Sequence, residues 1–233
     1  MGGMTTLGDL PAYRAVPDGE GPWPGMVLVH EAFGIDAVMR RAADRVAAMG
    51  YLVLAPDLLS RGRRTACLLR TFRALQRGHG RAFDDIAAAR AAVVADPSCS
   101  GAVGVIGFCL GGGFALVLAG RPGFDVSVVN YGALPDDPSA LDGACPVVAS
   151  YGGRDRYLSG AAEKLENALR DRGVPHDVRE YPDAGHSFLN DEDNQPWYVA
   201  PVSRVVLQAG PEPASAEDAW GRIEVFLETH LRR

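Results

Sequence analysis

The chain has 233 residues, with 23 Lys and Arg against 29 Asp and Glu, which gives a formal charge of −6. This acidic balance argues against a nucleic-acid-binding protein, because such a protein needs a basic face to meet phosphates. No apolar run approaches the roughly 20 residues that cross a bilayer and the N-terminus has no secretory signal pattern, so we expect a cytoplasmic protein that binds no membrane.

Short apolar runs rich in β-branched residues alternate with longer, alanine-rich stretches of helical pattern. The short runs are continuously apolar, which is typical of strands buried on both faces of a mostly parallel sheet. The alternation predicts one α/β domain spanning residues 1–233, as a monomer or homodimer, with residues 190–214 and their four prolines forming a long surface excursion. In chain order, the expected elements are strand 26–30, helix 37–49, strand 51–55, helix 81–95, strand 103–107, helix 110–120, strand 126–131, strand 146–151, helix 161–172, strand 176–181 and helix 216–231.

The four cysteines form no Cys-x-x-Cys pair and have no histidine at ligand spacing, so the sequence predicts no metal site. Cys67, Cys99 and Cys145 fit the usual role of free cysteines as small buried hydrophobic residues. Cys109 differs, because it lies at the centre of a Gly-Phe-Cys-Leu-Gly segment between an expected strand and an expected helix.

This segment around Cys109 has the form of a nucleophile elbow, G-x-S-x-G, with cysteine in place of serine. The turn is so tight that its flanking positions, Gly107 and Gly111, must lack bulky side chains. The N-terminus of the following helix favours a thiolate and a neighbouring oxyanion. The alternatives are a glycine-rich turn that holds a buried cysteine by accident, and a dinucleotide-binding loop. The absence of a G-x-G-x-x-G motif disfavours the latter.

A nucleophilic cysteine needs a base and an orienting acid, and both follow it in the order nucleophile, acid, base. Asp155 comes directly after strand 146–151, and His186 comes after strand 176–181. Because ligands bind at the carboxyl edge of such sheets, these side chains can converge with Cys109. Taken alone, Asp155 is more often a structural turn residue, and His186 is as readily a loop residue as a base. Their order and placement together favour a triad.

The segment His-Glu-Ala-Phe-Gly at residues 30–34 follows the first expected strand. In proteins with a nucleophile elbow of this kind, the loop at this position supplies the second N–H group of the oxyanion hole. We expect the N–H groups of Ala32 and Leu110 to form the oxyanion hole, with Phe33 near the substrate. Glu31 brings an acid to the same region. The alternative for Glu31 is a solvated carboxylate or a cap for helix 37–49.

Five motifs in unbroken order, H-E-x-F-G, P-D-L, G-F-C-x-G-G, G-G-x-D and A-G-H-S-F, resemble the dienelactone hydrolase family over about residues 26–190. The resemblance implies an α/β-hydrolase fold, with a mostly parallel central sheet and helices on both faces. It implies a triad of Cys109, Asp155 and His186, and it implies that Glu31 holds the resting thiol until substrate arrives. It also implies hydrolysis of the enol-lactone ring of dienelactones, without metal or cofactor.

One departure concerns the substrate carboxylate. The family prototype carries an Arg four residues after the catalytic His, and Asn190 stands at that position here. A second family Arg cannot be aligned, which leaves Arg63, Arg64 and Arg70 as candidates. Asparagine cannot replace the charged, two-pronged contact of an arginine. The sequence therefore predicts a preference for neutral or weakly polar esters and lactones, unless one of these three arginines reaches the site.

The expected function is cofactor-free hydrolysis of a small lactone or ester through an acyl-thioester on Cys109. Two alternatives stay open. One is a general carboxylesterase without lactone preference, and the other is a non-catalytic relative that binds a small ligand or a partner protein. An intact triad favours an enzyme over a binding protein.

Overall fold

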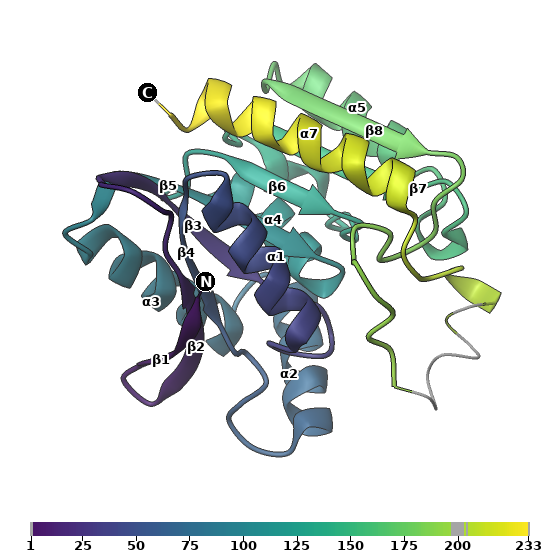
Figure 1. The fold of residues 1–233 in the computed structure, drawn as a ribbon. Helices are drawn as coiled ribbons and strands as arrows, with labels where there is room; N and C mark the ends of the chain where they lie inside the picture. The colour runs from purple at the N-terminus through teal and green to yellow at the C-terminus, as the bar shows by residue number, and fades with distance from the viewer. Residues whose placement is uncertain (1, 197–202, 204, 233) are drawn as a thin grey trace.

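The computed structural model describes residues 2–196, 203 and 205–232. A single eight-stranded sheet runs through them. Its strands are β1 (Gly3–Leu7), β2 (Leu10–Ala15), β3 (Trp23–Val29), β4 (Leu52–Pro56), β5 (Cys99–Phe108), β6 (Ser127–Asn130), β7 (Val147–Gly152) and β8 (His176–Tyr181). They lie in the order β1-β2-β4-β3-β5-β6-β7-β8 (Figure 1). Strand β2 pairs antiparallel with β1 and β4, and all other neighbours are parallel.

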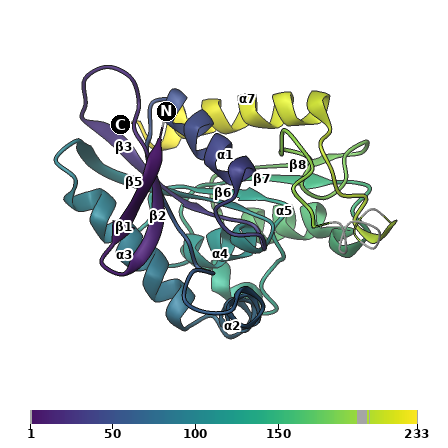
Figure 2. The ribbon, with the colours of Figure 1, turned by 60° about the horizontal axis from the view of Figure 1, so that its bottom comes forward.

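Helices cover both faces of this sheet. They are α1 (Ala37–Ala48), α2 (Arg64–Arg77), α3 (Arg81–Ala95), α4 (Leu110–Ala119), α5 (Ala161–Asp171) and α7 (Pro213–His230), with short 3₁₀ helices η1 (Pro138–Leu141) and η2 (Arg156–Leu158). Helices α1 and α7 lie on one face, and α3, α4 and α5 lie on the other (Figures 1 and 2). Helix α2 packs against α3 and α4 rather than on the sheet (Figure 2).

Every strand and helix expected from the sequence is present, and the predicted α/β class with a mostly parallel sheet is confirmed. The largest shift is at β5, which begins at Cys99 rather than 103. It is followed by β3, which begins at Trp23 rather than 26, and α7, which begins at Pro213 rather than 216. The prediction missed β1, β2 and α2. Strand β1 is half exposed at the sheet edge, and α2 is an arginine-rich helix away from the sheet, so neither carries the continuous apolar run that marked the core elements.

Helix α4 is buried along its whole length, because it lies between the sheet and its neighbouring helices α2 and η1. Gly112 allows this close packing. A Cβ atom there would lie 2.6 Å from the carbonyl oxygen of Asn130 and 2.8 Å from the Cα of Gly132. The first turn of α4 is therefore held against the carboxyl end of β6 by contact between backbones.

We predict opposite effects on stability for two glycine substitutions. Gly112→Ala forces backbone atoms apart and should lower the free energy of unfolding by roughly 1–3 kcal/mol. Gly221→Ala, in the middle of α7 with nothing within 4 Å of the new Cβ, should raise it by roughly 0.5–1 kcal/mol. Urea unfolding of both variants measures the difference. Equal effects would contradict the close backbone packing at Gly112.

Candidate active site

Cys109 lies at the sharp turn between β5 and α4, with φ of 54° and ψ of −116°. A positive φ is unfavourable for a residue other than glycine. Its neighbours make the turn possible: a Cβ on Gly107 would lie 2.0 Å from the oxygen of Gly111, and a Cβ on Gly111 would lie 2.0 Å from the oxygen of Val29. The N–H of Cys109 donates to the oxygen of Asn130 at 3.0 Å. The half-buried cysteine thus has the geometry that the elbow sequence predicts.

The ring of His186 is joined to Asp155, with 2.6 Å between Nδ1 and Oδ2. Both side chains are buried. The other carboxylate oxygen, Oδ1, accepts the N–H of Tyr157 at 3.0 Å, so Asp155 is held from two sides. The bond to Asp155 directs the Nδ1 proton to the carboxylate and leaves Nε2 for a second group. Nε2 is buried and forms no hydrogen bond with any described residue.

Three effects set the charge of His186. Burial disfavours the protonated ring, but the sulfur of Cys109 and the carboxylate of Asp155 outweigh it and raise the pKa of His186 from 6.5 to about 10. The sulfur therefore lies within electrostatic reach of the ring, and both residues line one cavity. A protonated imidazole stabilises a neighbouring thiolate, which is the reactive form of cysteine.

The loop that carries His186 is supported by a segment that follows it by twenty residues. The N–H of His186 donates to the oxygen of Leu207 at 2.9 Å, and the N–H of Gly210 donates to the oxygen of His186 at 3.0 Å. Gly185 permits the contact, because a Cβ there would lie 1.8 Å from the oxygen of Gln208. This part of the expected surface excursion thus positions the backbone of His186. Residues 197–202 and 204 lie outside the described residues.

Glu31 is buried beside the His186 loop and its carboxylate is surrounded by neutral donors. Ser187 Oγ donates to Oε1 at 3.1 Å, Asn194 Nδ2 donates to Oε2 at 3.1 Å, and Asn190 Nδ2 lies 3.3 and 3.2 Å from the two oxygens. Burial raises the pKa of Glu31, and the amides of Asn194 and Asn190 with the charge of His186 oppose that rise. Among the described residues, no hydrogen bond joins Glu31 to Cys109.

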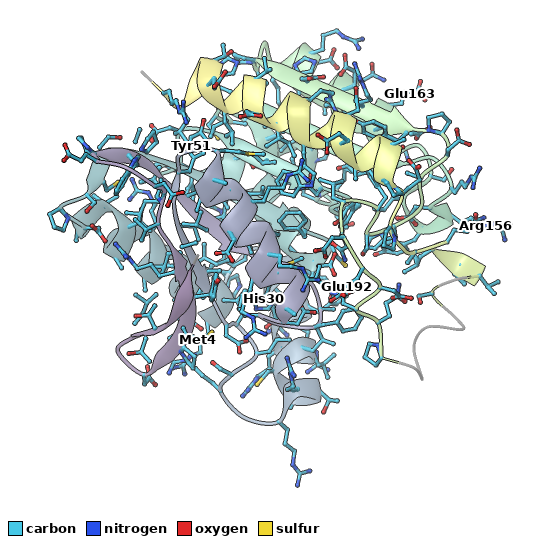
Figure 3. The ribbon with its side chains drawn as sticks, viewed as in Figure 1. Met4, His30, Tyr51, Arg156, Glu163 and Glu192 are labelled. Carbon is cyan, nitrogen blue, oxygen red and sulfur yellow. The ribbon has the colours of Figure 1, made fainter. Side chains whose placement is uncertain are left out.

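His30 supports the same loop and was given no role by the sequence analysis. Its ring is fully buried and is labelled in Figure 3. The Nε2 atom accepts the N–H of Leu58 at 3.0 Å, and the Nδ1 atom lies 2.6 Å from the backbone oxygen of Glu31. Burial lowers the pKa of His30, so the ring is neutral. The bond ties the loop after β3 to the loop after β4. The motif H-E-x-F-G contained this residue, but only the fold shows what its ring contacts.

An apolar cavity of about 400 Å³ opens beside Cys109 and His186. Ala32 and Leu110, the residues predicted to form the oxyanion hole, both line it. Helix α2 supplies one wall, where Leu69 and Phe72 are about half exposed at the rim. The lining residues are Ala32, Thr65, Leu68, Leu69, Phe72, Leu75, Cys109, Leu110, Tyr131, Ala133, Tyr157 and His186.

The other residues predicted to bind substrate lie outside this lining. Arg63 is exposed at the start of α2, and Arg64 Nη2 donates to the oxygen of Phe33 at 2.6 Å. Asn190 is turned to Glu31, and its Oδ1 accepts the hydroxyl of Tyr131 at 3.3 Å. Among the described residues, no arginine lines the cavity.

The described residues contain neither a cluster of metal-binding side chains nor a membrane-spanning helix. No three His, Cys, Asp or Glu side chains are grouped as a metal ion would require. No described helix combines the length and hydrophobicity needed to span a bilayer.

The profile of the dienelactone hydrolase family matches residues 10–231. The chain belongs to this family. It is 32% identical to a carboxymethylenebutenolidase of Rhodococcus opacus, over 88% of this chain and 81% of that one. It is also 32% identical to a carboxymethylenebutenolidase homologue of Methylorubrum extorquens, over 96% of this chain and 78% of that one.

Solved structures agree on the fold. A dienelactone hydrolase homologue from Klebsiella pneumoniae superposes with a TM-score of 0.76 at 24% identity, covering 99% of each chain. An acylaminoacyl peptidase of Pyrococcus horikoshii superposes over the whole of this chain and 41% of its own, with a TM-score of 0.71. The protein therefore has the α/β-hydrolase fold expected from its motifs and is a member of a hydrolase family.

The raised pKa of His186 predicts a difference in pH dependence between the native protein and Cys109→Ala. A folded-state pKa above the unfolded value stabilises the protein fully below about pH 6.5, and this contribution is lost as the pH rises through about 10. Without the sulfur, the pKa of His186 should fall, and the protein should lose less stability as the pH rises. NMR titration of His186 and urea unfolding across this range measure both. An unchanged pKa in Cys109→Ala would show that the two side chains do not interact.

Proposed function

We propose that the protein hydrolyses small lactones or esters through a covalent thioester on Cys109, without a cofactor. The thiolate attacks the carbonyl carbon, and the N–H groups of Ala32 and Leu110 stabilise the oxyanion. Protonated His186 gives its proton to the leaving alcohol oxygen as the C–O bond breaks. The neutral ring then takes a proton from water, which attacks the thioester and releases the acid and the thiolate. Asp155 holds the ring throughout.

One observation carries this proposal. The buried ring of His186 is fixed through Nδ1 by Asp155 at 2.6 Å, while its Nε2 atom has no hydrogen-bond partner among the described residues and shares a cavity with the elbow cysteine. A catalytic base needs this combination of an oriented ring and a free nitrogen. A protein that only binds a ligand has no need of it.

Glu31 acts in this proposal through its charge. Its oxygens are already occupied by Ser187, Asn190 and Asn194, so a direct bond to the thiol would require these contacts to break. A buried carboxylate repels a second negative charge placed in the same site. This effect would protect Cys109 from oxidation between turnovers.

We predict that Cys109→Ala folds normally and loses turnover of p-nitrophenyl acetate by several orders of magnitude. The matched control is Cys145→Ala, because burial raises the pKa of the Cys145 thiol to about 12 and keeps it unreactive. That variant should retain activity. Turnover by Cys109→Ala close to that of the native protein would make the nucleophile assignment wrong, and no turnover by the native protein would favour the binding relative.

The cavity favours neutral substrates over charged ones. Its wall on α2 is formed by Leu68, Leu69, Phe72 and Leu75, and no arginine among the described residues lines it. An unpaired carboxylate in such a place would lose its hydration without a compensating contact. This supports the preference predicted from Asn190, and it keeps a general carboxylesterase as the second candidate.

We therefore expect kcat/KM for dienelactone to lie below that for its methyl ester. Leu69→Arg places a cation at the half-exposed rim. It should raise kcat/KM for the free acid relative to kcat/KM for the methyl ester by roughly tenfold, which is the effect of one charged hydrogen bond. Leu69→Gln is the control without charge. A native preference for the free acid would contradict the proposed substrate class, and a lactone and linear-ester panel would separate lactonase from carboxylesterase.

A further inference from the structure

Helix α2 borders a second cavity on its other side. This cavity has a volume of about 370 Å³ and shares no lining residue with the cavity beside Cys109. Its walls come from α2, from the loop before it and from the first turn of α3, which packs beside α2 (Figure 2). The two cavities differ in character, because the wall beside Cys109 is apolar and the wall here is dominated by arginine.

Five arginines and a single carboxylate, that of Asp85, line the second cavity. Arg61 is neutralised there, since it pairs with Asp9 and lies 3.7 Å from Asp85. Arg81 also acts on the carboxylates of Asp9 and Asp85 and favours their charged forms. The other three, Arg70, Arg73 and Arg77, form no ion pair with any described residue. Three unpaired cations in one small space repel each other, in a protein whose formal charge is −6. A bound anion would remove that repulsion.

Arg70 is already fixed in place. Its Nη2 atom donates to the oxygen of Arg61 and to the sulfur of Cys67, both at 3.1 Å. This leaves its remaining guanidinium N–H groups for a ligand, and an arginine held in advance loses less entropy when it binds an oxyanion.

The cavity also contains polar groups that the described residues leave without a partner. The hydroxyl-bearing Thr71 lines the cavity, and no described residue forms a hydrogen bond with it. The Nε atom of Arg61 is buried and equally unpartnered. Buried polar groups are normally satisfied by protein, water or ligand. A buried, unpartnered N–H donor in an arginine-lined space points to an oxyanion.

The first turn of α3 faces the same cavity. Gly80, Arg81 and Ala82 line it, and no side chain caps this fifteen-residue helix at Gly80. The N–H groups at a helix N-terminus and the helix dipole both favour an anion. They add backbone donors to those of the arginines.

We propose that this cavity is a binding site for a small multivalent phosphate compound, such as a pyrophosphate or nucleoside diphosphate group. Three unpaired guanidinium groups exceed what one monovalent anion can neutralise, and the planar fork of arginine matches phosphate oxygens in pairs. The volume accommodates more than a single phosphate. The site lies outside the hydrolytic machinery and does not depend on the proposed function.

Calorimetric titration of the full-length protein with pyrophosphate tests this site. Saturable binding with one ligand per chain is expected, and it should weaken as salt is raised. Arg73→Gln combined with Arg77→Gln should reduce the affinity by at least roughly tenfold. The control pair, Arg170→Gln with Arg179→Gln, removes the same charge from exposed positions on α5 and β8 and should leave binding unchanged. Circular dichroism of both variants verifies folding.

Several results would overturn the proposal. One is the absence of saturable pyrophosphate binding. Another is an equal loss of affinity in the two double-arginine variants, because that result would show an effect of net charge alone. Citrate serves as a multivalent carboxylate of similar size. Binding of citrate as tight as that of pyrophosphate would make the phosphate class wrong, whereas weaker binding of citrate supports it.

Discussion

The site depends on a steric constraint at the turn between β5 and α4, where backbone segments approach too closely for any side chain. The positive φ of Cys109 costs of the order of 1–3 kcal/mol. It persists because Gly107, Gly111 and Gly112 contact backbone atoms of neighbouring elements, which cannot move aside as flexible side chains could. The sulfur position is therefore set by the sheet, and every other group of the site is placed relative to it.

Charge is concentrated at one end of the cavity and excluded from the rest. His186, Asp155 and Glu31 are all buried, where electrostatic interactions are stronger than in water. The hydrogen-bond donors to Glu31 are neutral, so no cation among them offsets the charge of its carboxylate. The α2 wall, in contrast, is lined by apolar side chains. The charged groups and the apolar wall of the site thus come from different elements.

Much of this was predictable because core strands and tight turns leave strong local signals. The apolar runs located the six strands β3 to β8, and glycine spacing located Cys109 with its unusual backbone. The order of motifs then placed Asp155 and His186 at neighbouring strand ends, where the structure joins them. These features follow from local sequence and from the rules of parallel sheets.

The rest depends on contacts between distant segments, which leave no local pattern. Asn190 stands where an arginine was expected, but its orientation toward Glu31 is set by residues more than 150 positions away. Helix α2 was not predicted because its apolar side lines the cavity beside Cys109 and its arginines line the second cavity. Its sequence therefore lacks the pattern of a helix packed on the core. The backbone hydrogen bonds of Leu207 and Gly210 to His186 come from a segment whose sequence pattern is typical of a surface loop, so the pattern did not predict them.

The support of His186 by residues 207–210 has a consequence for synthesis on the ribosome. The turn at Cys109 and the strands around it emerge early, but the backbone of His186 gains its two partners only when Leu207 and Gly210 have been made, just before helix α7. A nascent or truncated chain that ends before Leu207 carries Cys109 and His186 without this support of the His186 loop. The backbone of the His186 loop is therefore fixed in place only after this later segment has been made.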